Sequence, residues 1–219
     1  MDNQEMKALA SQLRQPEGEA GVQVAELMNE TNNKMICHSI HHLNMLDNNR
    51  VLELGHGNCS HLKYLLKQRT NLTYYGLETS ELMKNEAQKI NSSFLDKKVA
   101  SFHLYGGLEI PFSDNYFDRV FTVNTIYFWD NPKLLISELH RVIKQSGILN
   151  ITFVEGESMK KLPFTQYGFS YYNKDKIAQL ISNVSFRIVA AETQMETVKS
   201  KTGDTVNREY TTITIKKEA

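Results

Sequence analysis

Two glycines lie between an apolar run and a helical segment near residue 55. Residues 51–54 are predicted as a short strand, Gly55 and Gly57 follow it directly, and residues 62–66 carry leucines at helical spacing. Glycine at such a turn lets the backbone bend tightly and leaves room for a ligand. The free N–H groups at the start of the next helix favour a polar or anionic group there. This pattern predicts a ligand site at the carboxyl end of the strand.

The loop alone leaves the ligand open. A dinucleotide fingerprint has a third glycine at the position of Ser60, whereas a loop that binds S-adenosylmethionine has it at the position of Cys59. A third alternative is an α/β protein that uses glycine only to turn the chain.

Two acidic residues flank the loop and narrow the choice between these ligands. Glu53 lies within the apolar strand end, where a carboxylate is costly to bury unless it meets a cation or several donors. The α-ammonium group of an amino-acid ligand would meet that need, directly or through water. Glu78 ends the second predicted strand, where it could accept hydrogen bonds from both ribose hydroxyls of a nucleoside.

Strands alternate with helices over the region that must position these residues. The predicted strands after the first span residues 72–77, 99–104, 117–123 and 148–153, and a capped helix begins at Asn131-Pro132. Such alternation predicts an α/β fold with a parallel sheet covered on both faces.

The two ends of the chain differ from this middle region. Residues 1–46 are predicted to be helical, with a break in 14–21, where one Pro and two Gly occur. Residues 184–192 and 205–216 are predicted as two strands. Their polar link, Thr193–Asp204, has no apolar helical face, so they are expected to pair antiparallel.

Five short motifs then appear in order and at fitting intervals. They are Glu53-Leu54-Gly55-His56-Gly57, Gly76-Leu77-Glu78-Thr79-Ser80, Ile110-Pro111-Phe112, Phe117-Asp118-Arg119-Val120 and the run from Leu139 to Gly147. Together, over residues 50–155, they resemble the class I S-adenosylmethionine-dependent methyltransferases. Within this family, the motifs are most similar to those of the small-molecule branch that includes the ubiquinone- and menaquinone-biosynthesis C-methyltransferases.

The resemblance implies a Rossmann-like, doubly wound sheet of seven strands, mostly parallel with one antiparallel strand near the C-terminus. It also implies that S-adenosylmethionine is the cofactor and S-adenosylhomocysteine the product. The cofactor-binding residues that it implies are Glu53, Gly55, His56, Gly57, Cys59, Glu78, Thr79, Gly106, Gly107, Leu108, Asn124 and Thr125.

Three departures from the family pattern stand out. Cys59 replaces the usual third glycine, and Gln145-Ser146 stands where Lys-Pro is common. Gly106 occupies the position of an acid that holds the adenine amino group in many relatives. The resemblance therefore implies that the backbone of 106–108 and apolar packing hold the adenine, or that this chain binds adenine more weakly than those relatives do.

Aromatic residues follow the fourth and fifth predicted strands, where a methyl acceptor would bind. We expect Tyr127, Trp129, Phe169, Tyr171 and Tyr172 to contact a flat or cationic acceptor, although any one of them could simply pack the core.

A general base is harder to assign. The weak candidates are His38 and His42, which share a helix face at i, i+4, and Tyr127. The same histidine spacing could suit a metal, but no carboxylate or cysteine cluster lies nearby in sequence, so no metal is expected. A base is needed only if the acceptor must lose a proton.

The composition of the chain excludes several classes of protein. The 219 residues carry 25 basic and 25 acidic side chains, which argues against nucleic acid as a partner. Two cysteines, no signal-like start and no apolar run long enough for a membrane span indicate a cytoplasmic protein. The sequence does not distinguish a monomer from a homodimer. Residues 1–46 are expected to form a helical cap or lid, and residues 47–219 the cofactor-binding domain.

The sequence therefore predicts methyl transfer to a small, aromatic or planar acceptor. The alternative is a catalytically silent domain that binds the cofactor or its product as a sensor or partner subunit. A nicotinamide-dependent oxidoreductase comes third, because the motifs after the third strand argue against it.

Overall fold

A seven-stranded sheet organises the chain in the computed structural model, which describes residues 1–200 and 202–218. The strand order is β3-β2-β1-β4-β5-β7-β6. The strands are β1 (Arg50–Leu54), β2 (Thr73–Glu78), β3 (Ala100–Leu104), β4 (Phe117–Val123), β5 (Ile143–Val154), β6 (Phe186–Lys199) and β7 (Thr205–Lys217). Only β7 pairs antiparallel with both neighbours, and the pairs among β1 to β5 are parallel. The predicted fold class is confirmed.

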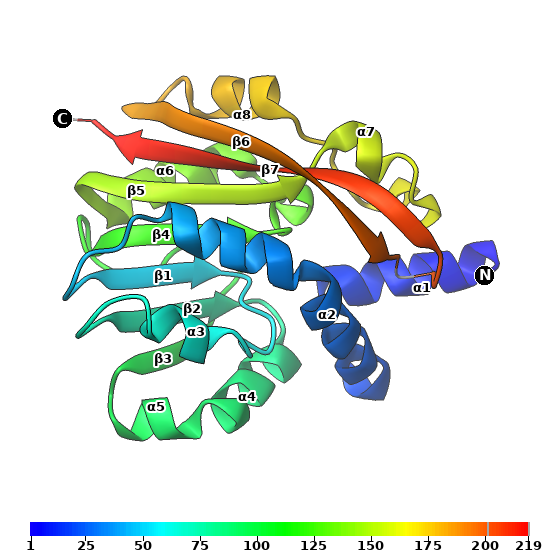
Figure 1. Cartoon of the computed structure of the whole chain (residues 1–219), viewed down its shortest axis with the longest axis horizontal. Coiled ribbons are helices and arrows are strands. Elements are labelled where there is room, and N and C mark those ends of the chain that lie inside the picture. The colour runs from blue at the N-terminus through cyan, green and yellow to red at the C-terminus, as the bar shows by residue number, and fades with distance from the viewer. Residues whose placement is uncertain (201, 219) are drawn as a thin grey trace.

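Helices cover the sheet. They are α1 (Asn3–Arg14), α2 (Gly18–His42), α3 (Leu62–Leu66), α4 (Glu81–Ile90), α5 (Ser92–Asp96), α6 (Pro132–Val142), α7 (Gly156–Met159) and α8 (Lys174–Ile181), with short 3-10 turns η1 (Ile126–Phe128) and η2 (Pro163–Gln166). Figure 1 shows α2 crossing one face of the sheet, in front of β1 and β4, with α6 and α8 behind. Residues 51–54 of β1 are buried, as expected for a central strand of a covered parallel sheet.

The N-terminal helices form where the sequence predicted them. Asp2 caps α1 by accepting hydrogen bonds from the Gln4 and Glu5 backbone amides. The predicted break separates α1 from α2, and Gly18 opens α2 with a φ of +62°. Figure 1 also shows a bend within α2. Thr31 donates its hydroxyl hydrogen bond to the Leu27 carbonyl oxygen, a contact that commonly bends helices.

Two predicted boundaries were wrong. The link predicted over Thr193–Asp204 is mostly strand, because β6 continues to Lys199 and pairs with β7 as far as Thr205. Polar residues fit this stretch because most of its side chains are exposed or half-buried at the edge of the sheet. The fifth strand begins at Ile143, because α6 runs directly into it through a bulge opposite β4. A Cβ at Gly147 would lie 2.6 Å from Ile143 Cγ2, so this bulge requires glycine.

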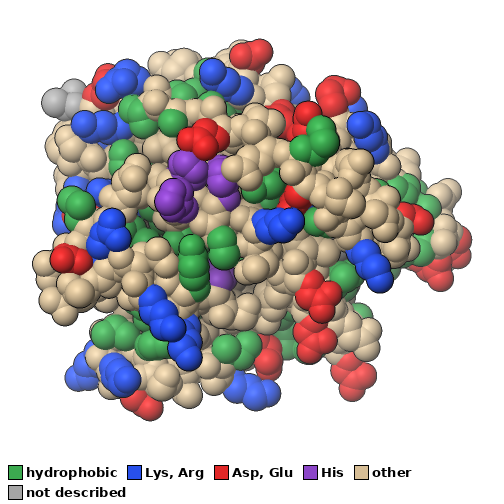
Figure 2. Space-filling model, in the orientation of Figure 1, with side chains coloured by type: hydrophobic (Ala, Val, Ile, Leu, Met, Phe, Trp, Pro, Cys, Tyr) green, Lys and Arg blue, Asp and Glu red, His purple; other side chains and the backbone are tan. Residues whose placement is uncertain are grey.

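Charges of both signs are scattered over the face of the molecule in Figure 2, as the net charge of zero predicts. None of the helices in the described ranges is long and apolar enough to cross a membrane.

Candidate active site

A cavity of about 340 Å³ opens at the carboxyl ends of β1, β2 and β4, between the sheet and the N-terminal helices. Its size is within the usual range for a small-molecule site, roughly 300–1,000 Å³. Ten of the predicted cofactor-binding residues line it: Glu53, Gly55, His56, Gly57, Glu78, Thr79, Gly106, Gly107, Asn124 and Thr125.

The glycine loop forms one wall of the cavity. Gly55 and Gly57 have φ angles of +69° and +55°, a region that favours glycine. A Cβ on Gly55 would lie 2.4 Å from Thr125 Cγ2, so the loop packs tightly against the residues after β4. A Cβ on Gly57 would have no neighbour within 4 Å, because this glycine faces the open cavity.

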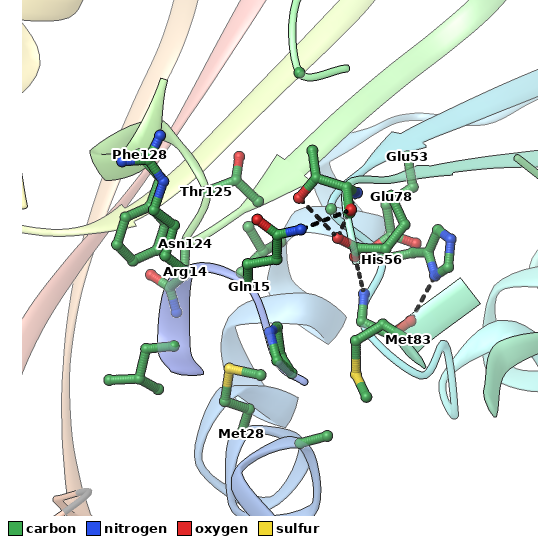
Figure 3. Close-up of a pocket in the computed structure, with 18 of the residues that line it drawn as sticks. Arg14, Gln15, Met28, Glu53, His56, Glu78, Met83, Asn124, Thr125 and Phe128 are labelled. Atoms are coloured by element: carbon green, nitrogen blue, oxygen red, sulfur yellow. Dashed lines mark hydrogen bonds between the residues drawn. The ribbon is translucent and has the colours of Figure 1, made fainter. Parts of the chain in front are cut away.

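Glu78 is held rigidly at the end of β2. Its carboxylate accepts hydrogen bonds from the backbone amides of Gly57 at 2.9 Å and Thr79 at 2.8 Å. A third comes from the Ser80 amide at 3.2 Å. The acid therefore joins the glycine loop to the start of α4, and its side chain faces the cavity (Figure 3).

Glu53 already has a partner that the sequence analysis missed. Its Oε2 accepts hydrogen bonds from the Tyr74 hydroxyl at 2.5 Å and His61 Nε2 at 2.8 Å. Burial opposes the charged form of His61, but the Glu53 carboxylate and Cys59 together outweigh burial and raise the pKa of His61 well above 6.5. The cation that Glu53 was expected to need is therefore supplied by His61. Glu53 Oε1 makes no hydrogen bond within the described ranges, and Glu53 lines the cavity.

Cys59 lies behind the loop and does not line the cavity. It has a left-handed φ of +51°, is fully buried, and its Sγ lies 3.1 Å from the Tyr74 hydroxyl. Burial raises the pKa of the Cys59 thiol. Leu108 also lies outside the lining, whereas Tyr105, which was not predicted, belongs to it. The roles of Cys59 and Leu108 toward a cofactor stay predictions.

His56 lies at the floor of the cavity. Its Nδ1 lies 2.6 Å from the Gly57 carbonyl oxygen, and its ring packs edge-on against Phe102. Burial lowers the pKa of His56, so the ring is neutral and Nδ1 donates to that carbonyl. Its Nε2 is buried without a hydrogen-bond partner in the described structure.

The turn between α1 and α2 covers the cavity. Gln15 Nε2 donates to the Thr79 carbonyl oxygen at 3.3 Å, and Arg14 pairs with Asp130 at 2.6 Å. Figure 3 shows Arg14 on the far side of the cavity from Glu78 and His56, with Gln15 between them and Met28 on α2 below. The predicted helical cap thus reaches over the site. The sequence offered no signal for these individual residues, because their types are ordinary for surface helices.

Asn124 directly follows β4 at the other side of the cavity, with a φ of +59°. Its Oδ1 accepts a hydrogen bond from the Tyr127 hydroxyl at 2.8 Å, and its Nδ2 lies 3.4 Å from Met35 Sδ on α2. The Tyr127 hydroxyl also accepts a hydrogen bond from the Val154 amide. Burial raises the pKa of Tyr127, and both hydrogen-bonding roles of its hydroxyl are taken, so in this arrangement Tyr127 orients Asn124.

A second, smaller cavity of about 70 Å³ adjoins the first, and the two share Leu13, Met28, Asn32, Asn124 and Phe128. Its other walls are mostly apolar and aromatic: Tyr127, Val154, Met159, Leu162, Phe164, Phe169, Val198, Lys199, Ser200, Val206 and Arg208.

The predicted acceptor residues divide between these cavities. Trp129 lines the larger one, and Tyr127 and Phe169 line the smaller one. Tyr171 and Tyr172 line neither of the two. Tyr171 donates its hydroxyl hydrogen bond to the Thr165 carbonyl oxygen, and the Tyr172 carbonyl oxygen accepts one from the Gly156 amide.

His38 and His42, the other candidates for a base, line neither cavity either. His38 lies over β7, with its Nδ1 2.9 Å from Thr212 Oγ1, and His42 lies beside Glu192 of β6.

The strand order, the glycine loop after β1 and the acid at the end of β2 are those of a Rossmann-like methyltransferase fold. In agreement, residues 52–151 match the family model described as a methyltransferase domain. YrhH of Bacillus subtilis (strain 168), which is named as a methyltransferase, is 24% identical over 124 residues, or 57% of this chain and 68% of YrhH. The narrower resemblance to the ubiquinone-biosynthesis branch stays a prediction.

Solved structures share the fold at low identity. One chain of the Haloferax volcanii complex between the Trm112 methyltransferase activator and a methyltransferase superposes with a TM-score of 0.76, 13% identity and 98% coverage of both chains. A Haemonchus contortus N-methyltransferase in complex with S-adenosylhomocysteine gives a TM-score of 0.66, 17% identity, and coverage of 85% of this chain and 53% of that one.

Proposed function

We propose that this methyltransferase uses S-adenosylmethionine, bound in the larger cavity, to methylate a small aromatic or planar acceptor bound in the smaller one. The observation that carries the proposal is the junction of the two cavities at Asn124 and Phe128. At this junction the larger cavity, which contains the buried carboxylates of Glu53 and Glu78, meets the smaller cavity, which has apolar and aromatic walls.

The residues present fit the cofactor. Glu78, fixed by three backbone amides, is placed to accept hydrogen bonds from ribose hydroxyls. Glu53 presents an oxygen that makes no hydrogen bond within the described residues, which suits an α-ammonium group. Gly57 and Gly106 would have no atom within 4 Å of an added Cβ, so the backbone leaves room for a ligand. When bound, S-adenosylmethionine supplies a methyl group that its sulfonium already activates.

The chain's own residues would then align the acceptor and exclude water. Phe128 and Phe169 pack edge-to-face at 4.6 Å between ring centres and offer a surface for a flat acceptor. The turn at Gln15 and Arg14 covers the larger cavity. Alignment in a closed site can supply much of the rate enhancement of a displacement. We assign no general base, because the pocket-lining hydroxyl of Tyr127 is already engaged.

Binding can be followed through the single tryptophan of the chain. Trp129 lines the larger cavity and donates its indole hydrogen bond to Thr125 Oγ1 at 3.1 Å. Titration with S-adenosylmethionine or S-adenosylhomocysteine is expected to change its fluorescence, and titration with NADH is not. Glu78→Ala should weaken both affinities, while Asp96→Ala on the exposed side of α5 should leave them unchanged. Absence of binding by the folded wild type would refute the proposal.

Turnover is tested separately by measuring S-adenosylhomocysteine formation with a set of flat aromatic acceptors. Binding of the cofactor without product for any acceptor would favour the silent, sensor-like alternative. The cytoplasmic location, the small-molecule partner and the lid role of residues 1–46 stay predictions.

A further inference from the structure

Two histidines and a glutamate meet on the surface, away from both cavities. His38 and His42 lie one turn apart near the end of α2, and Glu192 lies on β6. Glu192 Oε2 is 3.3 Å from His42 Nε2 and 3.8 Å from His38 Nε2. Figure 2 shows histidine side chains gathered beside an acidic one on this face, over α2. No metal was expected from the sequence because no carboxylate or cysteine cluster lies nearby in sequence, and the fold brings Glu192 to the histidines.

His38 is oriented like a metal ligand. Its Nδ1 lies 2.9 Å from Thr212 Oγ1, which lies 2.8 Å from Thr152 Oγ1. Metal-binding histidines usually donate the N–H of one ring nitrogen to such a partner, which fixes the ring and leaves the other nitrogen free for the metal. In His38 that other nitrogen, Nε2, is buried and makes no hydrogen bond within the described residues.

Glu192 offers a carboxylate oxygen to both histidines. Its Oε2 lies within 4.0 Å of Nε2 of His38 and of His42. Two imidazole nitrogens and one carboxylate oxygen are a ligand set that binds divalent transition-metal ions.

The spacing suits a tetrahedral ion. Zn²⁺ to ligand distances of about 2.0–2.1 Å place tetrahedral ligand atoms roughly 3.3–3.4 Å apart. The atoms of His42 and Glu192 already have this separation, and His38 Nε2 lies 3.8 Å from the same Glu192 oxygen, a few tenths of an ångström farther. The three ligand atoms all lie within 4.8 Å of one another. The Glu192 side chain is 49% exposed, which gives an ion a path from solvent and leaves a fourth position for water.

We propose that His38, His42 and Glu192 bind a divalent transition-metal ion, with Zn²⁺ the best match, and that the ion clamps the end of α2 to β6. The other half of α2 contributes Met28 and Asn32 to both cavities. The metal would thus fix the position of the helix that covers the site without contacting a substrate.

Calorimetric titration of the metal-stripped, untagged chain with ZnCl₂ tests the proposal. We expect one Zn²⁺ per chain, and at least roughly tenfold weaker binding in His42→Ala and in Glu192→Gln. His41→Ala is the matched control, because His41 is exposed next to His42 on the same helix but is not one of the three ligands. Equal affinity in wild type, His42→Ala and Glu192→Gln, or no binding by the wild type, would overturn the proposal.

Substitution with Co²⁺ separates this site from the buried group of Glu53, Cys59 and His61, which also has ligand atoms within 4.8 Å of one another. The proposed site has only nitrogen and oxygen ligands, so the Co²⁺ complex should lack a thiolate charge-transfer band. Its visible spectrum should be lost in His42→Ala and kept in Cys59→Ser. A thiolate band that Cys59→Ser removes would place the ion in the buried group and refute the assignment.

Discussion

The Arg208 guanidinium on β7 donates a hydrogen bond to the Thr31 carbonyl oxygen at the bend of α2. The same guanidinium pairs with Glu196 of β6 at 2.7 Å, and both charged side chains are buried. The far end of the β6–β7 hairpin therefore holds the helix that covers the site. A buried ion pair that also satisfies a helix carbonyl is costly to break, because each remaining group would lose its partner.

Replacing Arg208 should loosen α2. Arg208→Ala leaves Glu196 buried without its cation and is expected to lower the free energy of unfolding by about 3–5 kcal/mol. Hydrogen exchange of backbone amides near Thr31 should become faster. Urea unfolding and exchange mass spectrometry measure the two effects. Arg187→Ala is the control, because Arg187 pairs with Glu218 on the exposed side of β6. A similar effect of both variants would contradict this role of Arg208.

The two loop glycines should respond differently to alanine. Gly55→Ala combines a left-handed backbone with a 2.4 Å contact to Thr125, so it should cost more stability than the roughly 1–3 kcal/mol of the backbone alone. The added methyl group of Gly57→Ala meets no neighbouring atom, so this variant should lower the free energy of unfolding only by the cost of the left-handed backbone. The same methyl group enters the cavity and should weaken cofactor binding. Urea unfolding and fluorescence titration measure both. Equal destabilisation would show that packing on Thr125 is unimportant.

The buried pair of His61 and Glu53 makes a prediction about pH. The pKa of His61 is raised above 6.5 in the folded chain, so the folded chain keeps a proton that the unfolded chain releases as the pH rises. This stabilisation is fully present below pH 6.5 and is lost as the pH rises through the raised pKa. The stability difference between wild type and His61→Gln should therefore shrink with increasing pH, and the double variant Glu53→Gln/His61→Gln should lack the effect. A difference that is constant with pH would mean that His61 is neutral in the folded chain.

The aromatic wall of the smaller cavity should affect the acceptor and not the cofactor. Phe169→Ala removes a ring that contacts Phe128 and Phe164, and aromatic contacts contribute about 0.5–1.5 kcal/mol. We expect the acceptor KM to rise roughly twofold to tenfold with the affinity for S-adenosylmethionine unchanged. Tyr64→Ala, on the exposed side of α3, is the control. An unchanged KM in steady-state assays would remove Phe169 from the acceptor site.

Local patterns predicted the sheet and the centre of the site. Gly55, Gly57 and Glu78 lie at strand ends. At such positions the types of a few neighbouring residues are enough to indicate a turn or a capping side chain. The topology of a parallel sheet then brings those strand ends together, so their convergence on one cavity followed from the strand order.

Contacts between distant residues could not be predicted in this way. Arg208 and Thr31 are 177 residues apart, and Glu192 meets His42 across 150 residues of sequence. His61 pairs with Glu53 because the left-handed Cys59 turns the chain back, and nothing in the residue types requires that conformation. The extension of β6 was missed because its exposed edge carries polar residues, which on their own resemble a loop.

That extension divides the molecule into parts that can change separately in evolution. Val198, Lys199, Val206 and Arg208 form one wall of the smaller cavity, and all of them come from the end of a hairpin. Hairpin ends accept insertions and substitutions more readily than central strands. The loop after β1 and the acid at the end of β2 are on different strands, so new acceptor preferences could arise by changes at Val198, Lys199 and Val206, while Arg208 holds α2 in place and cofactor binding is inherited unchanged.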